Sequence, residues 1–147
     1  MSIKSKYFSV VAGIEKAEFL PLLLIRLVLA YGFYGTATMK WKNINSVAEW
    51  FGSIGIPAPH LNAYLAAGME ALGVVLLILG LGTRLIVIPL IIIMLVAIKT
   101  VHWANGFEAG ENGFEIPLYY IIMLLTLFVF GPGKLSLDKL LERKQNK

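Results

Sequence analysis

The sequence predicts an all-α protein, a polytopic membrane four-helix bundle with short interfacial helices. Of its 147 residues 58% are hydrophobic and only 15% are charged, and the mean hydropathy is +0.76. A soluble domain is nearer half apolar and a quarter charged. The apolar stretches also lack the polar alternation of a barrel wall, which favours helices over strands. A water-soluble enzyme and a disordered chain are therefore both excluded.

The elements follow from the length and spacing of the apolar residues. Residues 1–18 are expected to form a cytoplasmic interfacial helix, residues 19–133 the four-helix transmembrane domain, and residues 134–147 a basic cytoplasmic tail. A bilayer core of roughly 30 Å requires about 20 residues per spanning helix. Four segments approach that length: Phe19 to Met39, Ala63 to Leu81, Leu85 to Trp103 and Ile116 to Phe130.

Charge placement predicts the orientation of these spans. Nine Lys and Arg residues fall in the N-terminal arm, at the turn containing Arg84 and in the tail, against two, Lys40 and Lys42, in the opposite loops. The positive-inside rule then places both termini in the cytoplasm and the loops 40–62 and 103–115 outside. The same distribution explains the net charge of +4, so nucleic acid is not expected as a partner. The absence of cysteine excludes disulfides, zinc–thiolate sites, iron–sulfur ligation and thiol chemistry.

Charged residues inside spans are expensive and normally find partners in the protein interior. Glu70 shares a helical face with small residues, Ala66, Gly73 and Gly80 among them, so we expect it to point into the bundle. By helix rise Glu70 and Lys99 both lie roughly 8 to 10 Å below the outer boundary. We therefore expect an internal ion pair between them, with an alternative in which the pair only ties two helices together.

Other polar residues collect in the same outer half or stand apart from it. His102 lies one turn beyond Lys99, Glu115 and Tyr119 share a face of the last span, and Lys40 ends the first. Arg26 lies roughly 10 Å above the cytoplasmic end. Two readings of Arg26 stay open, direct pairing with Glu70 and snorkelling toward the inner surface.

The outer loops carry two further patterns. Trp41 and Trp103 fall near the outer interface, where aromatic rings anchor helices whatever the function. Residues 105–115 contain Asn-Gly-Phe-Glu twice, at 105–108 and 112–115. The glycines suit the turns of a folded cap, and a flexible linker would have the same composition.

An ordered set of motifs resembles the DoxX family of small bacterial four-helix membrane proteins. The set runs through Arg26, Phe33, Gly35, Lys40, Gly55-Ile56-Pro57, Glu70, Gly73, Gly80, Thr83, Arg84, His102, Gly113, Glu115, Gly131-Pro132-Gly133 and Ser136-Leu137-Asp138. The resemblance implies location in the bacterial inner membrane and a link to membrane oxidoreductase complexes. Some relatives act in sulfur-compound oxidation with quinone, and many have no assigned activity, so the fold is better implied than the reaction.

The resulting hypothesis is a quinone-linked oxidoreductase, or a subunit of a membrane oxidoreductase complex acting on sulfur compounds or in redox stress. Its catalytic candidates are Glu70, His102 and Lys99, and its candidates for binding substrate or quinone are Arg26, Lys40, Tyr119 and Glu115. Lys40 and Lys99 would attract an anionic sulfur substrate. Expected partners are the lipid bilayer, other oxidoreductase subunits and further copies of the chain.

Two alternatives belong to other functional classes. The first is a non-enzymatic scaffold or assembly factor, favoured by the small size and the lack of cofactor motifs. The second is a metal-handling protein using His102, Glu108, Glu111 and Glu115, with His60 nearby. Neither histidine has the spacing of a paired metal ligand, so no metal site is predicted.

Overall fold

The structure, a computed structural model, describes residues 3–15 and 17–145, and within these ranges it is helical and contains no strand. The α-helices are α1 (Ile3–Glu15), α2 (Phe19–Lys42), α3 (Ile44–Ser53), α4 (Pro59–Leu79), α5 (Thr83–Ala97), α6 (Glu115–Phe130) and α7 (Leu137–Gln145). A π-helical turn (Ile98–His102) and a 3₁₀ turn (Trp103–Asn105) extend α5, and a second 3₁₀ turn (Ala109–Glu111) lies in the loop before α6. The predicted all-α fold is confirmed.

Length and composition identify the helices that can cross a bilayer. In the described ranges three segments qualify: one containing α2, then α4, then α5 with its extension to Asn105. The fourth helix, α6, is apolar but only 16 residues long, and it packs along α5. Aliphatic and aromatic side chains cover the outside of all four, as expected for a surface in contact with lipid.

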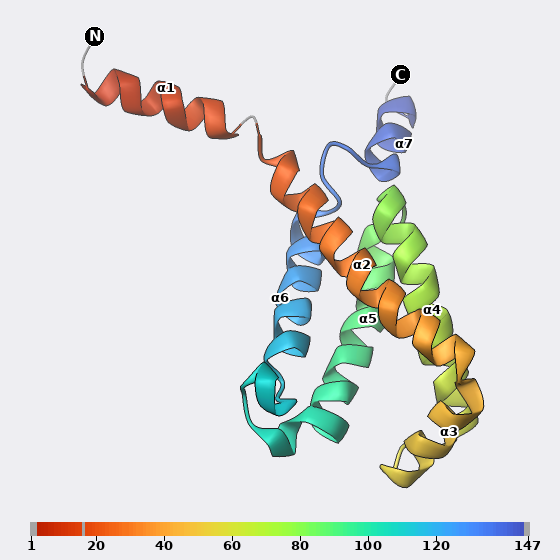
Figure 1. Ribbon diagram of the computed structural model, residues 1–147. Helices are drawn as coiled ribbons and strands as arrows, with labels where there is room; N and C mark the ends of the chain where they lie inside the picture. The colour runs from red at the N-terminus through yellow and green to blue at the C-terminus, as the bar shows by residue number, and fades with distance from the viewer. Residues whose placement is uncertain (1–2, 16, 146–147) are drawn as a thin grey trace.

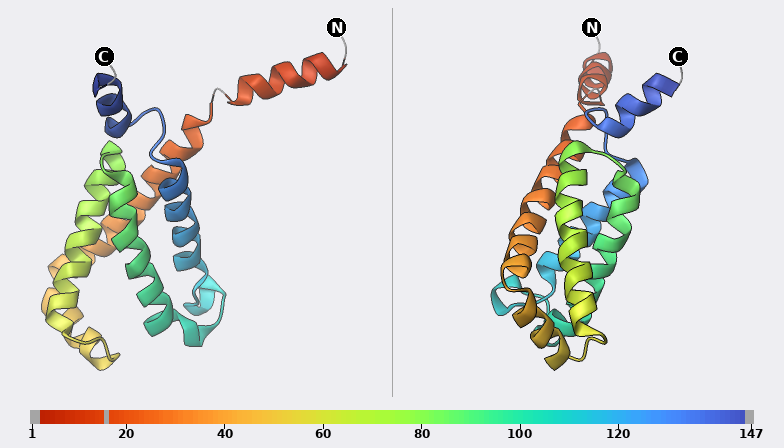
Figure 2. Two further views of the ribbon diagram at one scale, coloured as in Figure 1. Left: turned by 180° about the vertical axis from the view of Figure 1, so that it is seen from behind. Right: turned by 90° about the vertical axis from the view of Figure 1, so that its right-hand side faces the viewer.

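The four long helices form two pairs that are joined at one end. Both termini lie at this end, which we call the inner end (Figure 1). α2 packs chiefly against α4, and α5 against α6, while α4 and α5 are linked by the short turn at the inner end. The pairs diverge toward the opposite, outer end, where α3 packs on α4 beneath the first pair (Figures 1 and 2). α1 projects sideways from the inner end.

The core sits where the two pairs meet. Its buried side chains come from all four helices and include Leu29, Phe33, Leu77, Leu90, Leu124 and Leu127. Gly73 permits the close approach of α5, because a Cβ at this position would lie 2.9 Å from Cδ1 of Leu90. The buried stripe of α4 consists of Ala63, Ala67, Glu70, Gly73 and Leu77. The inward direction predicted for Glu70 is therefore confirmed, with Ala67 taking the buried place expected for Ala66.

Candidate functional site

Arg26 is the charged residue around which the inner end is built. Its side chain is 1% exposed. Nε and Nη2 donate to the carbonyls of Leu77 and Ile78 at 2.7 Å each, and Nη1 donates to the carbonyls of Pro132 and Leu135 at 2.9 and 2.8 Å. The first two carbonyls are among those that the C-terminal turn of α4 leaves without helical partners. Arg26 thus joins α4 to the segment after α6, and both sequence-based readings, pairing with Glu70 and snorkelling, were wrong.

Two more charged residues at the inner end bind backbone groups at helix termini, each with the charge that the helix dipole favours there. Arg84 donates to the carbonyls of Phe128 and Val129, both at 3.1 Å, near the C-terminus of α6. Asp138 accepts hydrogen bonds from the backbone N–H groups of Gly82 and Thr83, at 2.8 and 3.2 Å, at the N-terminus of α5. Cations at helix C-termini and an anion at an N-terminus are the arrangement that the helix dipoles favour.

Gly80 shows how tightly this junction is packed. It lies directly after α4 with φ of 64°, in the left-handed region that favours glycine. A Cβ there would lie 2.6 Å from Cβ of Ser136 and 2.8 Å from Cζ of Arg26. The backbone N–H of Asp138 also donates to the Gly80 carbonyl at 3.0 Å. The tail is therefore held against the turn between α4 and α5 from both sides.

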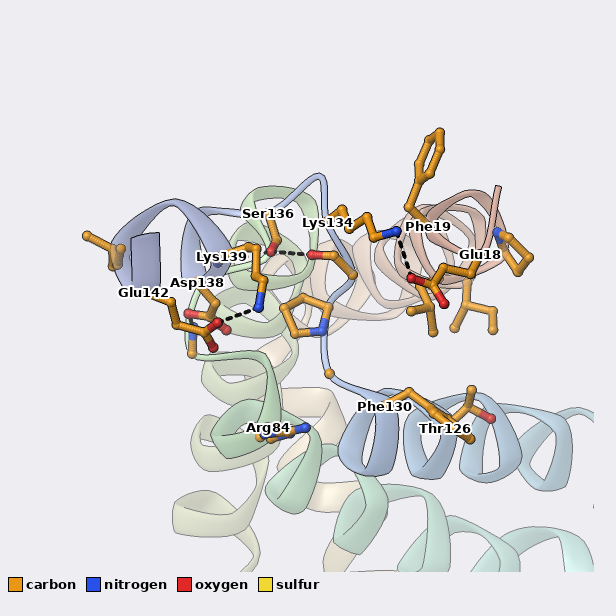
Figure 3. Close-up of a pocket in the computed structure, with 18 of the residues that line it drawn as sticks. Glu18, Phe19, Arg84, Thr126, Phe130, Lys134, Ser136, Asp138, Lys139 and Glu142 are labelled. Atoms are coloured by element: carbon orange, nitrogen blue, oxygen red, sulfur yellow. Dashed lines mark hydrogen bonds and ion pairs between the residues drawn. The ribbon is translucent and has the colours of Figure 1, made fainter. Parts of the chain in front are cut away.

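A cavity of about 860 Å³ opens beside this junction, between the start of α2, the start of α5, the end of α6 and the tail (Figure 3). Its apolar wall includes Phe19, Leu22, Ile25, Leu85, Phe130 and Leu141. Leu85 and Phe130 are 75% and 70% exposed, so the cavity borders the lipid-facing surface.

Two ion pairs form the polar rim of the cavity. Lys134 pairs with Glu18 at 2.8 Å and Lys139 with Glu142 at 2.7 Å (Figure 3). The hydrogen bond from the lysine in each pair lowers the pKa of the glutamate below its ordinary value. The cavity thus has apolar walls and a charged mouth, the lining of a site for an amphipathic molecule.

In the middle of the bundle the partner of Glu70 is Lys40. The Glu70 carboxylate is 1% exposed, and Nζ of Lys40 donates to both of its oxygens, at 2.9 and 2.8 Å. Lys99 is exposed on the π-helical turn, so the predicted Glu70–Lys99 pair was wrong. Equal depth in the membrane was not sufficient to bring Lys99 to Glu70. Lys99 does not lie on the buried face of α5, which is formed by Ile86, Val87 and Leu90. The two helix pairs also diverge toward the outer end (Figure 1).

The loop before α6 is a folded cap, which settles the alternative left open for residues 105–115. The two Asn-Gly-Phe-Glu repeats pair through their backbones, since the N–H groups of Phe114 and Glu115 donate to the carbonyls of Gly106 and Phe107, each at 3.0 Å. Phe114 packs against both Trp103 and Phe107, with ring centroids 5.5 Å apart in each case. Gly113 is required inside the cap because a Cβ there would lie 2.5 Å from the Gly106 carbonyl oxygen.

The remaining predicted site residues belong to this cap. Nδ1 of His102 lies 2.8 Å from the carbonyl oxygen of Asn112. The Glu115 carboxylate accepts a hydrogen bond from the Tyr119 hydroxyl at 2.8 Å and one from the backbone N–H of Ala109 at 3.0 Å. The predicted shared face of Glu115 and Tyr119 is confirmed. These contacts hold the loop together, and among the described residues no hydrogen bond links His102 or Tyr119 to the Glu70–Lys40 pair.

Sequence reasoning missed the residues that line the inner cavity. Arg84 entered it as part of the charge bias and, together with Ser136 and Asp138, through the family resemblance, whereas Thr126 and Phe130 did not enter it as site residues. The closing Gly-Pro-Gly and Ser-Leu-Asp motifs were a usable signal, because they follow the last span and must fold back onto the inner end. Their contacts with Arg26 could not be read from residue type, since Arg26 binds backbone carbonyls.

These features define a polytopic helical membrane protein in which charged residues tie the helix ends together. Comparison with known proteins makes the class specific: the DoxX family model matches residues 21–103, a range that contains Arg26, Lys40 and Glu70. The chain belongs to the DoxX family.

Three relatives show how far the similarity extends. A protein of Haemophilus influenzae without an assigned function is 36% identical over 131 residues, covering 83% of each chain. The Bacillus subtilis protein named "Putative oxidoreductase CatD" is 33% identical over 118 residues, covering 79% of this chain and 83% of that one. "Inner membrane protein YphA" of Escherichia coli is 28% identical over 132 residues, covering 86% and 93%. No solved structure matches the chain.

Proposed function

We propose that this DoxX protein is the membrane subunit of an oxidoreductase complex, and that it presents a quinone to its partner in the cavity at the inner end. The observation that carries the proposal is the cavity itself. Its volume of about 860 Å³ lies within the range of roughly 300 to 1,000 Å³ that is usual for sites of small molecules. The name of the Bacillus subtilis relative supports an oxidoreductase role.

The lining residues fit the head of a quinone. A quinone needs an apolar slot reachable from lipid and hydrogen-bond donors for two ring oxygens. Leu22, Ile25 and Phe130 supply the slot, and exposed Leu85 marks its lipid side. Nε and Nη2 of Arg84 donate to carbonyls of α6, and these hydrogen bonds hold the guanidinium in place at the cavity wall, where its remaining N–H groups can donate to a ring oxygen. The Lys139 ammonium is the second donor.

The chemistry divides between the two subunits. When bound, the quinone would accept two electrons from the partner oxidoreductase and two protons. Arg84 and Lys139 would hold the ring oxygens, and Glu142, exposed at the rim and in contact with Lys139, would pass protons from the aqueous side. The roles predicted for Glu70, His102 and Lys99 stay predictions. Of the two lysines expected to attract an anionic sulfur substrate, Lys40 has its charge neutralised by Glu70. That role would therefore fall to Lys99.

A cavity-filling variant tests the proposal. Thr126 lines the cavity, and in the described part of the chain its hydroxyl donates to the Ile122 carbonyl one turn away, so Thr126→Phe fills the space without breaking a hydrogen bond between helices. Ile122→Phe is the matched control, because Ile122 is 53% exposed on the outside of the same helix. Quinone extracted from protein purified in mild detergent should fall at least fivefold in Thr126→Phe and stay at the wild-type level in Ile122→Phe. Equal retention by both variants, or none in the wild type, would contradict the proposal.

A scaffold without chemistry of its own is the second candidate, and one observation favours it. Arg26, Glu70 and Asp138 are all engaged in contacts that join helices. Wild-type protein that lacks quinone but copurifies with a reproducible partner would support this candidate. Nothing in the described residues adds to the metal-handling hypothesis, since no three His, Asp or Glu side chains come together there.

We also propose that the inner end faces the cytoplasm of a bacterial inner membrane. The Lys and Arg bias supports this orientation, and both termini lie at that end (Figure 1). Because the chain has no cysteine, single cysteines at Asn45 and Gln145 can be labelled selectively. A membrane-impermeant reagent should reach position 45 from the outside and position 145 only after the membrane is opened. The reverse pattern would overturn the orientation.

A further inference from the structure

A groove of about 520 Å³ lies on the lipid-facing surface between α2 and α4. Both helices contribute to its lining, which consists of Tyr34, Ala37, Thr38, Trp41 and Lys42 from α2 and Ala71, Val74 and Val75 from α4. Its volume falls within the range of roughly 300 to 1,000 Å³ that is usual for sites of small molecules. The inner cavity is lined by a different set of residues at the opposite end of the bundle. The groove is therefore a second place where a molecule from the bilayer can bind.

The lining of the groove changes from charged to apolar with depth in the membrane. Lys42 ends α2 at the outer end, and Thr38 lies one turn deeper on the same helix. At about 1.5 Å per residue the two are about 6 Å apart along the helix axis, which matches the thickness of one headgroup layer, about 5 to 8 Å. The lining residues from α4 are all apolar. A cation, a hydroxyl and a hydrocarbon wall thus follow one another in the order of the phosphate, ester and acyl groups of a phospholipid.

The charge of Lys42 determines which headgroup fits the groove. The nearby Lys40 donates to both oxygens of the Glu70 carboxylate, so that pair is neutral. Among the described residues Lys42 forms no ion pair, and no Asp or Glu lines the groove. A lysine ammonium binds phosphate as a point charge. A headgroup with a net negative charge therefore complements Lys42, whereas the ammonium of a zwitterionic headgroup would be repelled by it.

Thr38 supplies a polar contact at the next level down. The hydroxyls of three other threonines donate to carbonyls of their own helices: Thr36, Thr100 and Thr126. In the part of the chain that the structure describes, the Thr38 hydroxyl makes no such hydrogen bond. An unsatisfied hydroxyl in hydrocarbon is costly. An ester carbonyl of a phospholipid at this depth would accept its hydrogen bond.

We propose that the groove between α2 and α4 is a binding site for one anionic phospholipid from the leaflet at the outer end. The phosphate lies at the Lys42 ammonium, an ester carbonyl accepts a hydrogen bond from the Thr38 hydroxyl, and one acyl chain fills the groove along α4. The acyl chain contacts both helices, so the bound lipid stabilises their association. The inner cavity is not involved, and the proposal does not depend on the quinone hypothesis.

Fluorescence quenching at Trp41 measures which lipid occupies the groove. The chain has three tryptophans, and the substitutions Trp50→Phe and Trp103→Phe leave Trp41, which lines the groove, as the sole indole. This parent protein is placed in vesicles of brominated phosphatidylglycerol and plain phosphatidylethanolamine, and in the reciprocal mixture. The two quenching curves give the relative binding of the two lipids beside Trp41. Phosphatidylglycerol should be favoured about fivefold, the effect expected of one lysine.

Two lysine variants of this parent identify the source of the preference. Lys42→Gln should abolish it, so that quenching follows the bulk lipid composition. Lys99→Gln removes an exposed lysine from the other helix pair and should leave the preference unchanged. Equal quenching by both lipids in the parent, or the same loss in both variants, would overturn the proposal. Trp41 that neither lipid quenches, as when a protein covers the groove, would overturn it as well.

A groove-filling variant tests whether the shape of the surface, and not charge alone, holds the lipid. Ala71→Phe fills the groove, whereas Leu72→Phe places the same ring on the outward face of α4, where Leu72 is 47% exposed. Native mass spectrometry counts the phosphatidylglycerol molecules that each purified protein retains in mild detergent. Ala71→Phe should retain one molecule per chain fewer than the wild type, and Leu72→Phe should retain as many. Equal retention by all three proteins would contradict the groove as the site.

Discussion

The inner and outer ends of the bundle satisfy their charges in different ways. At the inner end, Arg26, Arg84 and Asp138 bind backbone groups at the ends of other helices. Each contact joins segments far apart in the sequence, such as Arg26 and Leu135, which are 109 residues apart. At the outer end, the cap residues bind one another locally, and deeper in the bundle Lys40 of α2 forms an ion pair with Glu70 of α4.

The difference shows where the bundle is rigid and where it can adapt. The Leu77 and Ile78 carbonyls are fixed by α4, so an arginine that binds these two and also the Pro132 and Leu135 carbonyls of the segment after α6 holds the two segments in a single arrangement. Among the described residues the outer end has no such clamp, and the helix pairs diverge there (Figure 2). We therefore expect substitutions at the inner end to affect the whole fold and those at the outer cap to remain local.

The largest effect is expected from Arg26. Arg26→Leu leaves four buried or partly buried carbonyls without their donor and should lower the free energy of unfolding by at least about 4 kcal/mol. Arg26→Lys should lose nearly as much, because an ammonium lacks the planar fork that reaches several acceptors at once. Unfolding in detergent, followed by intrinsic fluorescence, measures both. Wild-type stability of the lysine variant would show that the clamp is not what holds this end.

The Lys40–Glu70 pair should come next. Lys40→Met strands a carboxylate that is 1% exposed and should cost about 3 kcal/mol, whereas the double variant with Glu70→Gln should recover most of that loss. Lys99→Met combined with Glu70→Gln is the control, and those two effects should add within about 0.5 kcal/mol. If the effects on the free energy of unfolding were non-additive for Glu70 with Lys99 and additive for Glu70 with Lys40, the ion pair predicted from the sequence would be correct.

A smaller effect is expected at the tail. Asp138→Ala removes the acceptor for two backbone N–H groups at the start of α5 and should cost about 1 to 2 kcal/mol. Hydrogen exchange should accelerate at Gly82 and Thr83 and along α7, while the amides of the 105–115 cap keep their protection. Faster exchange in the cap as well would mean that the two ends are not independent.

The smallest effect is expected from the exposed pair at the cavity rim. The pKa of Glu18 is lowered from its ordinary value of 4.5 by the hydrogen bond from Lys134, so the pair stabilises the fold at pH values above 4.5. This contribution is lost as the pH falls through the lowered pKa. Lys134→Gln should therefore melt slightly below the wild type at pH 7, and the difference should disappear in acid. A difference that grows in acid would have the wrong sign for this pair.

Sequence patterns predicted the helices and the inward face of α4 because both depend on periodicity. The stripe containing Glu70 and Gly73 repeats at helical spacing, and its small residues show where another helix must approach. Partners were harder to predict. Helix rise gives depth but not direction around the axis, which is why Lys99 was chosen over Lys40 for Glu70.

The inner site was largely invisible for a related reason. Every residue has a backbone carbonyl, so the acceptors of Arg26 cannot be recognised from the types or the spacing of residues in the sequence. Periodicity singled out Gly80 and the family resemblance added Asp138, yet only the fold shows that both meet Ser136 or the turn between α4 and α5. The cavity beside them depends on how α7 is held at the start of α5, and this placement follows from long-range contacts alone.

The Arg26 clamp has a consequence for synthesis of the protein. Arg26 belongs to the first spanning helix, but two of its four acceptors lie 106 and 109 residues later, after the last one. A chain emerging from the ribosome must hold this cation in the membrane with its acceptors incomplete until the final residues arrive. A nascent chain that stops before Pro132 therefore lacks two of the four acceptors of Arg26, so the inner end can close only after the last apolar helix has been made.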